Sequence, residues 1–297
     1  MGGPALPPTG WRLWLAGARP RTLPAAVVPV AVGTAAAVGE VDLIWWRVAA
    51  ALVVSLALQV ATNFVNDYAD GERGTDADRV GPLRLVGSGA ATAGQVKGAA
   101  LAAFAVAAVA GGALALAVGP ELFVVGLAAM VAAWAYTGGP KPYGYLGFGE
   151  LFVFVFFGLV ATVGSTYVQT ESLTALSFVA SVPVGLLSVA LLVINNLRDI
   201  AGDTASGKRT LAVRLGDRST RHLYVALMAI VGIGVVATAT FRWPAILGLA
   251  GLVAAVPPIR TVLSGAMGPN LIPVLGGNGR VALVTGLGLT IGLALGA

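Results

Sequence analysis

The sequence contains no cysteine and a single histidine, His222, in 297 residues. Without cysteine, the chain forms neither disulfides nor thiolate metal sites, and it has no cysteine nucleophile. One histidine excludes histidine-rich metal sites and argues against a Ser-His-Asp triad. The chemistry of this protein must therefore come from its other polar side chains.

Charged residues are also scarce. They make up 10% of the chain, whereas hydrophobic residues make up 57%. A soluble domain carries about 25% charged residues, so this composition indicates an all-α polytopic membrane protein. One crossing needs roughly 20 apolar residues, and this rule predicts nine membrane helices. They are expected at about 22–39, 46–66, 95–118, 121–137, 149–169, 174–196, 221–241, 243–263 and 280–296.

The few basic residues are unevenly distributed over the expected connections. Sixteen of the 18 Lys and Arg residues fall on one side of the membrane, and only Arg47 and Arg242 fall on the other. The positive-inside rule therefore predicts a cytoplasmic N-terminus and cytoplasmic charged loops in the cell membrane. Contact with anionic membrane lipids accounts for the net charge of +5 without nucleic acid as a partner. We expect residues 1–297 to form a single transmembrane domain.

One stretch, residues 63–84, gathers five of the thirteen carboxylates directly after an apolar segment. If the helix continues into it, Asn66 and Asp70 lie on one face. Asn63 and Asp67 then lie together on an adjacent face of the same helix, and spacing alone does not choose between the two pairs. Oxygen atoms stacked on a helix at a membrane surface suit Mg²⁺, which proteins usually bind with one or two carboxylates and substrate phosphates. The alternative is a solvated acidic loop that only ends a membrane helix.

A second Asn-x-x-x-Asp pattern lies at the end of the sixth expected helix. Asn195 and Asp199 are four residues apart, and Asp203 extends the pattern by one turn. A bundle can bring two such patterns face to face at one mouth, which favours the metal-site hypothesis. The oxygen ligands offered are Asp67, Asp70, Asp76, Asp199, Asp203, Asn66 and Asn195. The cations interleaved with them are Arg73, Arg79, Arg84, Arg198, Lys208 and Arg209.

This combination of side chains describes a pyrophosphate site. Carboxylates gather Mg²⁺, and neighbouring Arg and Lys side chains contact oxyanions. At the mouth of an apolar bundle, the expected ligand is a pyrophosphate with a long apolar tail. Departure of an allylic pyrophosphate requires metal ions that neutralise its charge, and the remaining cation must be kept from water, which a membrane cavity allows.

The connection between the fourth and fifth expected helices, residues 136–150, is rich in glycine, proline and tyrosine. One interpretation is a lid that carries Lys141 toward a phosphate, and the other is a turn with interfacial aromatic side chains. In the next helix, we expect the phenylalanine-rich run 151–157 to contact lipid or to pack in the core rather than to stabilise a cation. We expect Arg19 and Arg21 to anchor the topology, and the alternative is a contact with phosphate.

The ordered set of motifs resembles the UbiA-type intramembrane aromatic prenyltransferases, and most closely the branch that acts on 1,4-dihydroxy-2-naphthoate. The similar segments are residues 19–23, 63–70 with 74–76, 81–84 with 88–89, 136–140 with 143–145, 195–203, 207–208 and 210–216. The resemblance implies nine membrane helices around a central cavity, with two Asp-rich motifs that hold Mg²⁺ and a prenyl pyrophosphate. It favours Asn66 with Asp70 as the first pair, and Asp199 with Asp203 as the second.

The chain departs from the wider superfamily at two places. Gly74 stands where a further Asp is usual, and Asp76 is the expected substitute. The loop from Tyr136 to Lys141 is one residue longer than the usual Tyr-x-x-x-Lys, which weakens a phosphate role for Lys141. Both departures point to the naphthoate branch and away from enzymes that act on 4-hydroxybenzoate.

The resemblance therefore implies transfer of a polyprenyl group from polyprenyl pyrophosphate to 1,4-dihydroxy-2-naphthoate, with loss of CO₂, in menaquinone synthesis. Each expected site residue then has a role. The catalytic aspartates are Asp67, Asp70, Asp199 and Asp203, and the Mg²⁺ ligands are these four with Asn66 and Asp76. The pyrophosphate contacts are Arg73, Arg198, Lys208 and Lys141, and the residues that orient the acceptor carboxylate are Arg84 and Arg198.

Two other hypotheses remain at this point. Within the enzyme class, the acceptor could be another phenolic acid such as 4-hydroxybenzoate, or homogentisate, or the product could be a haem or lipid ether. From a different class, the acidic loops could form the gate of a divalent-cation transporter. Transporters keep their ionisable ligands near the bilayer midplane, and the expected spans carry almost no carboxylates at that depth, which favours the enzyme.

Overall fold

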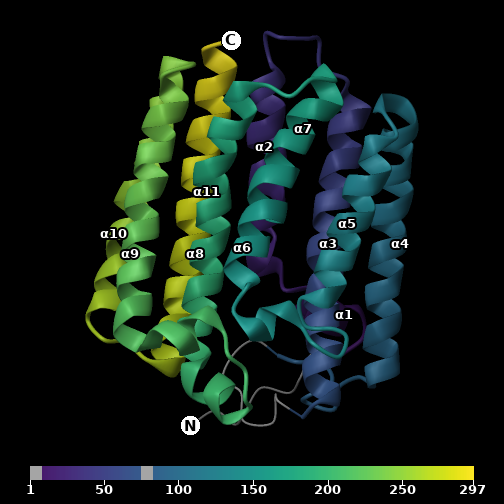
Figure 1. Ribbon diagram of the computed structural model, residues 1–297, viewed down its shortest axis with the longest axis vertical. Coiled ribbons are helices and arrows are strands. Elements are labelled where there is room, and N and C mark those ends of the chain that lie inside the picture. Colours follow the sequence, from purple (N-terminus) through teal and green to yellow (C-terminus); the bar gives the residue numbers. More distant parts are fainter. Residues whose placement is uncertain (1–8, 75–82) are drawn as a thin grey trace.

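The computed structural model describes residues 9–74 and 83–297, so the candidate residues Asp76, Asp78 and Arg79 lie outside the described residues. The described chain is a bundle of helices aligned along one long axis, and it contains no strand (Figure 1). The all-α fold predicted from composition is therefore confirmed.

Seven helical segments of the described chain are long and apolar enough to cross a membrane. They are α3 (Trp45–Glu72), α4 (Ala93–Val118), α6 with η3 and α7 (Gly149–Val153, Phe154–Val160, Ala161–Thr170), α8 (Ala175–Ala205), α9 (Leu211–Ala239), η4 with α10 (Trp243–Leu249, Ala250–Leu263), and η5 with α11 (Gly268–Leu271, Ile272–Leu295). The remaining helices are shorter: α1 (Trp11–Ala18), η1 (Pro20–Thr22), α2 (Pro24–Ala37), α5 (Glu121–Ala135) and η2 (Tyr143–Leu146).

Two of the nine expected crossings, 22–39 and 121–137, correspond to the shorter apolar helices α2 and α5. The 14 residues of α2 extend for about 21 Å, less than the roughly 30 Å hydrocarbon core. The count of nine crossings and the orientation of the N-terminus stay predictions. Gly119 and Pro120 form the short connection between α4 and α5.

Both acidic motifs are helical, because α3 and α8 continue past the ends expected from hydropathy. Helix α3 runs to Glu72 rather than to residue 66, and α8 runs to Ala205 rather than to residue 196. Hydropathy marks where a helix leaves lipid, whereas backbone hydrogen bonds continue into the polar region beyond. The next helix, α9, begins ten residues earlier than expected and bends at Gly216, whose φ of 77° is outside the helical region.

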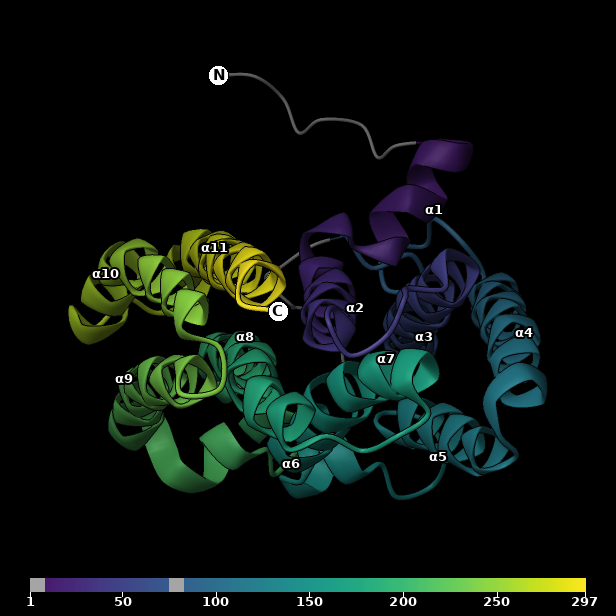
Figure 2. The same cartoon turned by 90° about the horizontal axis from the view of Figure 1, so that it is seen from above.

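Helix α8 occupies the centre of the bundle and α4 its edge (Figure 2). The most apolar stretch of α8 is 67% buried, whereas that of α4 is 17% buried. The wide-turned segment η3 lies directly against α8. A Cβ atom on Gly158 would be 2.6 Å from the Cα of Gly185, so only glycine permits this approach of the two backbones. The second acidic motif is thereby carried on the most enclosed helix.

The end of the bundle opposite the acidic motifs is held together by two buried arginines. Arg47 donates to the carbonyl of Val168 at 2.9 Å and to Glu171 at 2.9 Å. Arg242 donates to the carbonyl of Leu293 at 3.0 Å, near the C-terminus that lies at the top of Figure 1. These are the two basic residues that the charge distribution assigned to the other side of the membrane.

Candidate active site at the mouth of the bundle

A cavity of about 690 Å³ lies between α2, α3, α5, the α6–α7 segment and α8. Its polar end is lined by Asn66, Asp70, Asp199, Asp203 and Lys208, and its deeper walls are mostly apolar. Along α3 the lining extends from Ala51 to Asp70, a separation of about 28 Å along the helix. The cavity thus reaches almost through the roughly 30 Å hydrocarbon core.

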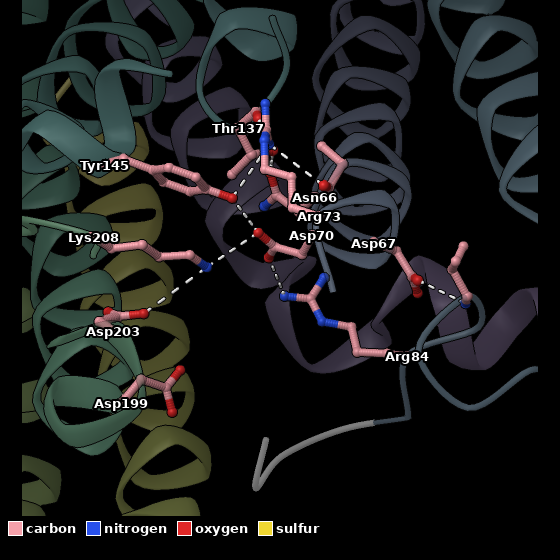
Figure 3. A network of polar contacts seen from close by, with 12 residues as sticks. Asn66, Asp67, Asp70, Arg73, Arg84, Thr137, Tyr145, Asp199, Asp203 and Lys208 are labelled. Atoms are coloured by element: carbon pink, nitrogen blue, oxygen red, sulfur yellow. Dashed lines mark hydrogen bonds and ion pairs between the residues drawn. The ribbon is translucent and has the colours of Figure 1, made fainter. Parts of the chain in front are cut away.

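Asp70 is at the centre of the polar end (Figure 3). Its carboxylate is 3% exposed and receives donors from three separate parts of the chain. Arg84 Nη2 lies 3.2 Å from Oδ2, Lys208 Nζ lies 3.1 Å from Oδ1, and the hydroxyl of Tyr145 donates to the same Oδ1. The gathering of basic side chains around one buried carboxylate makes this mouth a candidate site for an anion.

The second acidic motif faces Asp70 from α8 (Figure 3). Asp199 accepts two hydrogen bonds of 2.7 Å from the guanidinium of Arg198. Lys208 connects the two motifs, because its Nζ is 3.9 Å from Asp203 Oδ1 as well as 3.1 Å from Asp70. The expected meeting of two acidic patterns at one mouth is therefore what the structure shows.

The donor set at the mouth fits Mg²⁺ bound together with a phosphate. Among the described residues, no three carboxylates come close enough to form a metal cluster by themselves. Asp70 on α3 and the Asp199–Asp203 pair on α8 instead line opposite walls of one cavity. This is the arrangement expected for Mg²⁺, which keeps few protein ligands and takes others from substrate phosphates.

Asp67 does not line this cavity. Its carboxylate is fully buried on the other side of α3, where it accepts backbone hydrogen bonds from Leu85 at 2.7 Å and from Val86 at 3.0 Å (Figure 3). Both oxygens are used to hold the chain that follows the first acidic motif. The expectation that Asp67 binds metal or acts in catalysis is therefore corrected: its position is structural.

Two of the cations expected to contact pyrophosphate also lie elsewhere. The guanidinium of Arg73 donates to the carbonyls of Thr137 and Gly139, each at 2.6 Å. Lys141 is exposed and is absent from the cavity lining. Asn66 does line the cavity, and its Oδ1 accepts a hydrogen bond of 2.6 Å from Thr137. The loop thus supports the first motif through Thr137, and the lid interpretation for Lys141 is not supported.

Tyr145 is the residue that this loop brings to the site. The loop is fixed by a backbone hydrogen bond of 2.8 Å from Arg209 to Tyr145, and Lys208 Nζ lies 4.6 Å from the centre of the tyrosine ring. Burial, followed by the nearby charge of Asp70, raises the pKa of Tyr145 well above its usual range. The tyrosine therefore remains a hydroxyl donor at neutral pH and cannot serve there as a base.

Several cavity residues were missed or misjudged from the sequence. Phe152, Phe156 and Phe157 line the cavity, so the expectation of lipid contact or simple core packing is corrected for them. Arg19 and Arg21 also line it, which is more consistent with the alternative of a phosphate contact than with a topological anchor alone. A helical wheel over residues 149–168 could not have revealed the cavity-facing phenylalanines, because the wide turns of η3 change the periodicity.

A comparison with protein-family models identifies the group to which these features belong. Residues 26–265 match the model of the UbiA prenyltransferase family. The chain is a member of this family. The match includes both acidic motifs and most of the cavity wall.

Curated members of the family are similar along almost the whole chain. The 1,4-dihydroxy-2-naphthoate octaprenyltransferase of Mycobacterium leprae is 49% identical over 95% of this chain and 96% of its own length. The Escherichia coli protein of the same name is 39% identical over 72% of each chain. A UbiA homolog from Archaeoglobus fulgidus, solved bound to DMAPP and Mg²⁺, has a TM-score of 0.65 at 17% identity and covers 95% of this chain and 99% of its own. The predicted family and fold are confirmed, and divalent-metal use occurs within the family.

Proposed function

We propose that this protein transfers a polyprenyl group from polyprenyl pyrophosphate to 1,4-dihydroxy-2-naphthoate, with loss of CO₂, in menaquinone biosynthesis. The main support is the geometry of the cavity mouth, where Asp70 faces Asp199 and Asp203 at the polar end of a long apolar cavity. Similarity to naphthoate octaprenyltransferases along 95% of the chain supports this acceptor over 4-hydroxybenzoate or homogentisate.

The pyrophosphate binds at the polar end and the prenyl tail extends into the apolar part of the cavity. Arg198 supports this placement, because its Nη1 is buried and has no hydrogen-bond acceptor within residues 9–74 and 83–297. A buried guanidinium N–H without an acceptor is costly, and an oxyanion satisfies it. Lys208, which contacts both acidic motifs, is the second pyrophosphate contact.

The residues that would hold Mg²⁺ are Asn66, Asp70, Asp199 and Asp203. When bound there, Mg²⁺ neutralises the charge that the departing pyrophosphate develops. Arg84 and Arg198 both line the cavity, and we assign them to orient the acceptor carboxylate. The aromatic walls at Phe152 and Phe156 exclude water from the allylic cation until the ring attacks it.

A divalent-cation transporter is less consistent with the structure. The three cavity-lining aspartates, Asp70, Asp199 and Asp203, lie near the ends of α3 and α8 rather than at mid-depth. A transporter would be expected to keep its ligands near the bilayer midplane. The position of the carboxylates instead suits a headgroup bound at the surface and a tail bound below it.

The protein is a multi-pass membrane protein, and we assign it to the cell membrane with the acidic mouth in the cytoplasm. This side carries sixteen of the 18 basic residues. A cytoplasmic mouth gives access to a water-soluble naphthoate, while the apolar donor arrives within the membrane. We assign the whole chain, residues 1–297, to one prenyltransferase domain.

The proposal is tested by a transfer assay on the purified protein in detergent. The assay offers octaprenyl pyrophosphate and Mg²⁺ with 1,4-dihydroxy-2-naphthoate or 4-hydroxybenzoate, and mass spectrometry identifies the product. We expect a decarboxylated prenylnaphthoquinol that disappears on addition of EDTA and returns with excess Mg²⁺. Product from 4-hydroxybenzoate alone would contradict the acceptor, and no product from either would contradict the enzyme assignment.

A further inference from the structure

Glu150 is a buried carboxylate that the function proposed above does not use. It is the second residue of α6, is 8% exposed, and belongs to an apolar helical span. Ionisable side chains inside membrane-spanning segments are costly, and those that persist are generally functional. The contacts of Glu150 indicate what this one does.

The carboxylate of Glu150 holds the side chain of Asn196 on α8. Asn196 Nδ2 donates a hydrogen bond of 2.9 Å to Glu150 Oε1. The other carboxylate oxygen, Oε2, is shielded from solvent, and no group in the described ranges donates to it. A buried carboxylate that is not fully satisfied is a weak source of stability, so its interaction with Asn196 calls for a functional explanation.

This contact fixes the orientation of the Asn196 amide. In the structure the NH₂ end of the amide faces Glu150, the orientation in which an ionised carboxylate accepts a hydrogen bond from it. The amide oxygen Oδ1 must then point the other way. Asn196 lines the cavity, and none of the residues that the structure describes donates a hydrogen bond to Oδ1. The cavity therefore contains a hydrogen-bond acceptor, Asn196 Oδ1, whose direction depends on the contact of the same amide with Glu150.

Asn196 lies one helical turn deeper than the pyrophosphate level. Asn196, Asp199 and Asp203 share one face of α8, at spacings of three and four residues. Because α8 ends at Ala205, beside the mouth, Asn196 is about 4.5 Å farther from the mouth than Asp199. The reacting carbon of a prenyl donor is bonded to the pyrophosphate, so the attacking ring must lie at this next level.

We propose that Asn196 Oδ1 accepts a hydrogen bond from a ring hydroxyl of the aromatic acceptor, and that Glu150 is the positioning residue for this amide. The inference rests on the proposed function and adds the group of the acceptor that is recognised. Arg84 and Arg198 bind the carboxylate of the acceptor, and Asn196 binds a hydroxyl on the same ring. The cationic contact to the carboxylate and the hydrogen bond from the hydroxyl together set the orientation of the ring relative to the allylic carbon. The cationic contact alone would leave the ring free to rotate.

The decisive experiment compares 1,4-dihydroxy-2-naphthoate with its two monomethyl ethers in the transfer assay. Methylation removes the hydroxyl proton and leaves Oδ1 unpaired. The wild-type protein should lose about tenfold in kcat/KM with one of the ethers, the cost of about one hydrogen bond. With 1,4-dihydroxy-2-naphthoate, kcat/KM of the Asn196→Ala variant should fall by a similar factor. This variant should then use that ether and 1,4-dihydroxy-2-naphthoate with similar kcat/KM.

Variants at Glu150 test the positioning role. Glu150→Met removes the acceptor that orients the amide, and it should raise KM for the naphthoate severalfold while KM for octaprenyl pyrophosphate stays unchanged. Glu150→Gln keeps an acceptor oxygen and should restore part of the loss. The control is Glu121→Gln, since Glu121 is exposed, accepts a hydrogen bond of 2.6 Å from Tyr167 and does not line the cavity.

The outcomes separate the inference from the function on which it rests. Absence of transfer by the wild-type protein would overturn the proposed function and the inference together. If Asn196→Ala transfers at the normal rate and still prefers 1,4-dihydroxy-2-naphthoate to the monomethyl ether, the inference alone is overturned. Equal losses for donor and acceptor in Glu150→Met, accompanied by a lower Tm, would show that Glu150 only stabilises the fold, and would also overturn it.

Discussion

Asp67 and Asp70 lie three residues apart on α3 and have different surroundings. The oxygens of Asp67 accept two backbone N–H groups outside the cavity, whereas those of Asp70 receive Arg84, Lys208 and Tyr145 at its mouth. A backbone N–H gives a carboxylate a fixed neutral partner, while long cationic side chains can shift toward a bound anion. The first residue therefore stabilises the fold, and the second is suited to substrate and metal.

Replacement of Asp199 by Asn should abolish turnover without unfolding the bundle. The change keeps the size of the side chain but removes the charge that the metal and the pyrophosphate require. We expect kcat to fall by about 10²–10³-fold, as when a charge-stabilising group is lost, with the protein still folded and Tm lowered only by the loss of one hydrogen bond from Arg198. The control is Asp217→Asn, because Asp217 pairs with Arg221 at 2.7 Å and does not line the cavity. Near-normal product formation by Asp199→Asn would contradict the assignment.

Replacement of Asp67 by Asn should give the opposite pattern. An Asn side chain presents one NH₂ group to a backbone N–H, so one buried donor loses its acceptor. The expected cost is about 1–3 kcal/mol in the free energy of unfolding, measured by thermal denaturation in detergent. The Mg²⁺ concentration needed for half-maximal activity should stay at the wild-type value. A large increase in that concentration would show that Asp67 binds metal after all.

The helices α3, α5 and α7 form the deep part of the cavity, and small residues keep it open. Gly126 on α5 and Gly164 on α7 both line the cavity, and a Cβ atom at either position would meet nothing within 4 Å. Their missing side chains are therefore not needed for close helix packing, unlike the pair Gly158 and Gly185. We infer that this space accommodates the far units of the prenyl tail.

Filling this space should restrict the enzyme to donors with shorter prenyl chains. In Gly126→Leu, a larger side chain enters the cavity without displacing a neighbour, so the fold should be retained. With octaprenyl pyrophosphate we expect kcat/KM to fall by about tenfold, the usual cost of steric overpacking. Transfer from geranyl pyrophosphate should stay close to wild type. The matched control is Gly98→Leu, an exposed position on α4 with nothing within 4 Å; equal losses with both donors would contradict the tail placement.

Over the whole molecule, polar contacts are divided between the two ends of the bundle. The mouth concentrates charges that can rearrange around a ligand, whereas Arg47 and Arg242 at the other end bind backbone carbonyls. The last carbonyls of a helix lack partners within it and carry partial negative charge. Arg47 satisfies Val168 near the end of α7, and Arg242 satisfies Leu293 at the end of α11. One end is thus suited to binding and the other to stability.

Loss of the Arg47 contacts should destabilise the protein and leave its kinetics unchanged. Arg47→Met preserves much of the side-chain volume but leaves the Val168 carbonyl without its donor. We expect a loss of about 2 kcal/mol in the free energy of unfolding, seen as a lower Tm in detergent, with KM for both substrates unaltered. The exposed residue Arg218 provides the control variant, Arg218→Met, which should have no effect on Tm. An increased KM in Arg47→Met would place Arg47 in the functional site.

The membrane fold, the two acidic motifs and the family could be predicted from the sequence because each depends on a local pattern. Runs of apolar residues require a lipid environment, and Asn-x-x-x-Asp spacing places oxygens on one helical face. Asp70, Asp199 and Asp203 were identified in this way, and the structure brings them to one cavity mouth. Arg73 and Lys141 were misjudged, because sequence proximity to a motif does not determine the direction of a long side chain.

The sequence by itself determined that this protein spans a membrane and has two helix ends that carry Asn and Asp side chains with basic residues beside them. Hydrophobic length and helical spacing are sufficient for those conclusions. Only the tertiary structure decided that Asp67 accepts backbone hydrogen bonds, that Tyr145 contacts Asp70 and that Glu150 contacts Asn196. Those contacts join residues far apart in the chain or on different faces of a helix, and they depend on how helices pack, which no local pattern encodes.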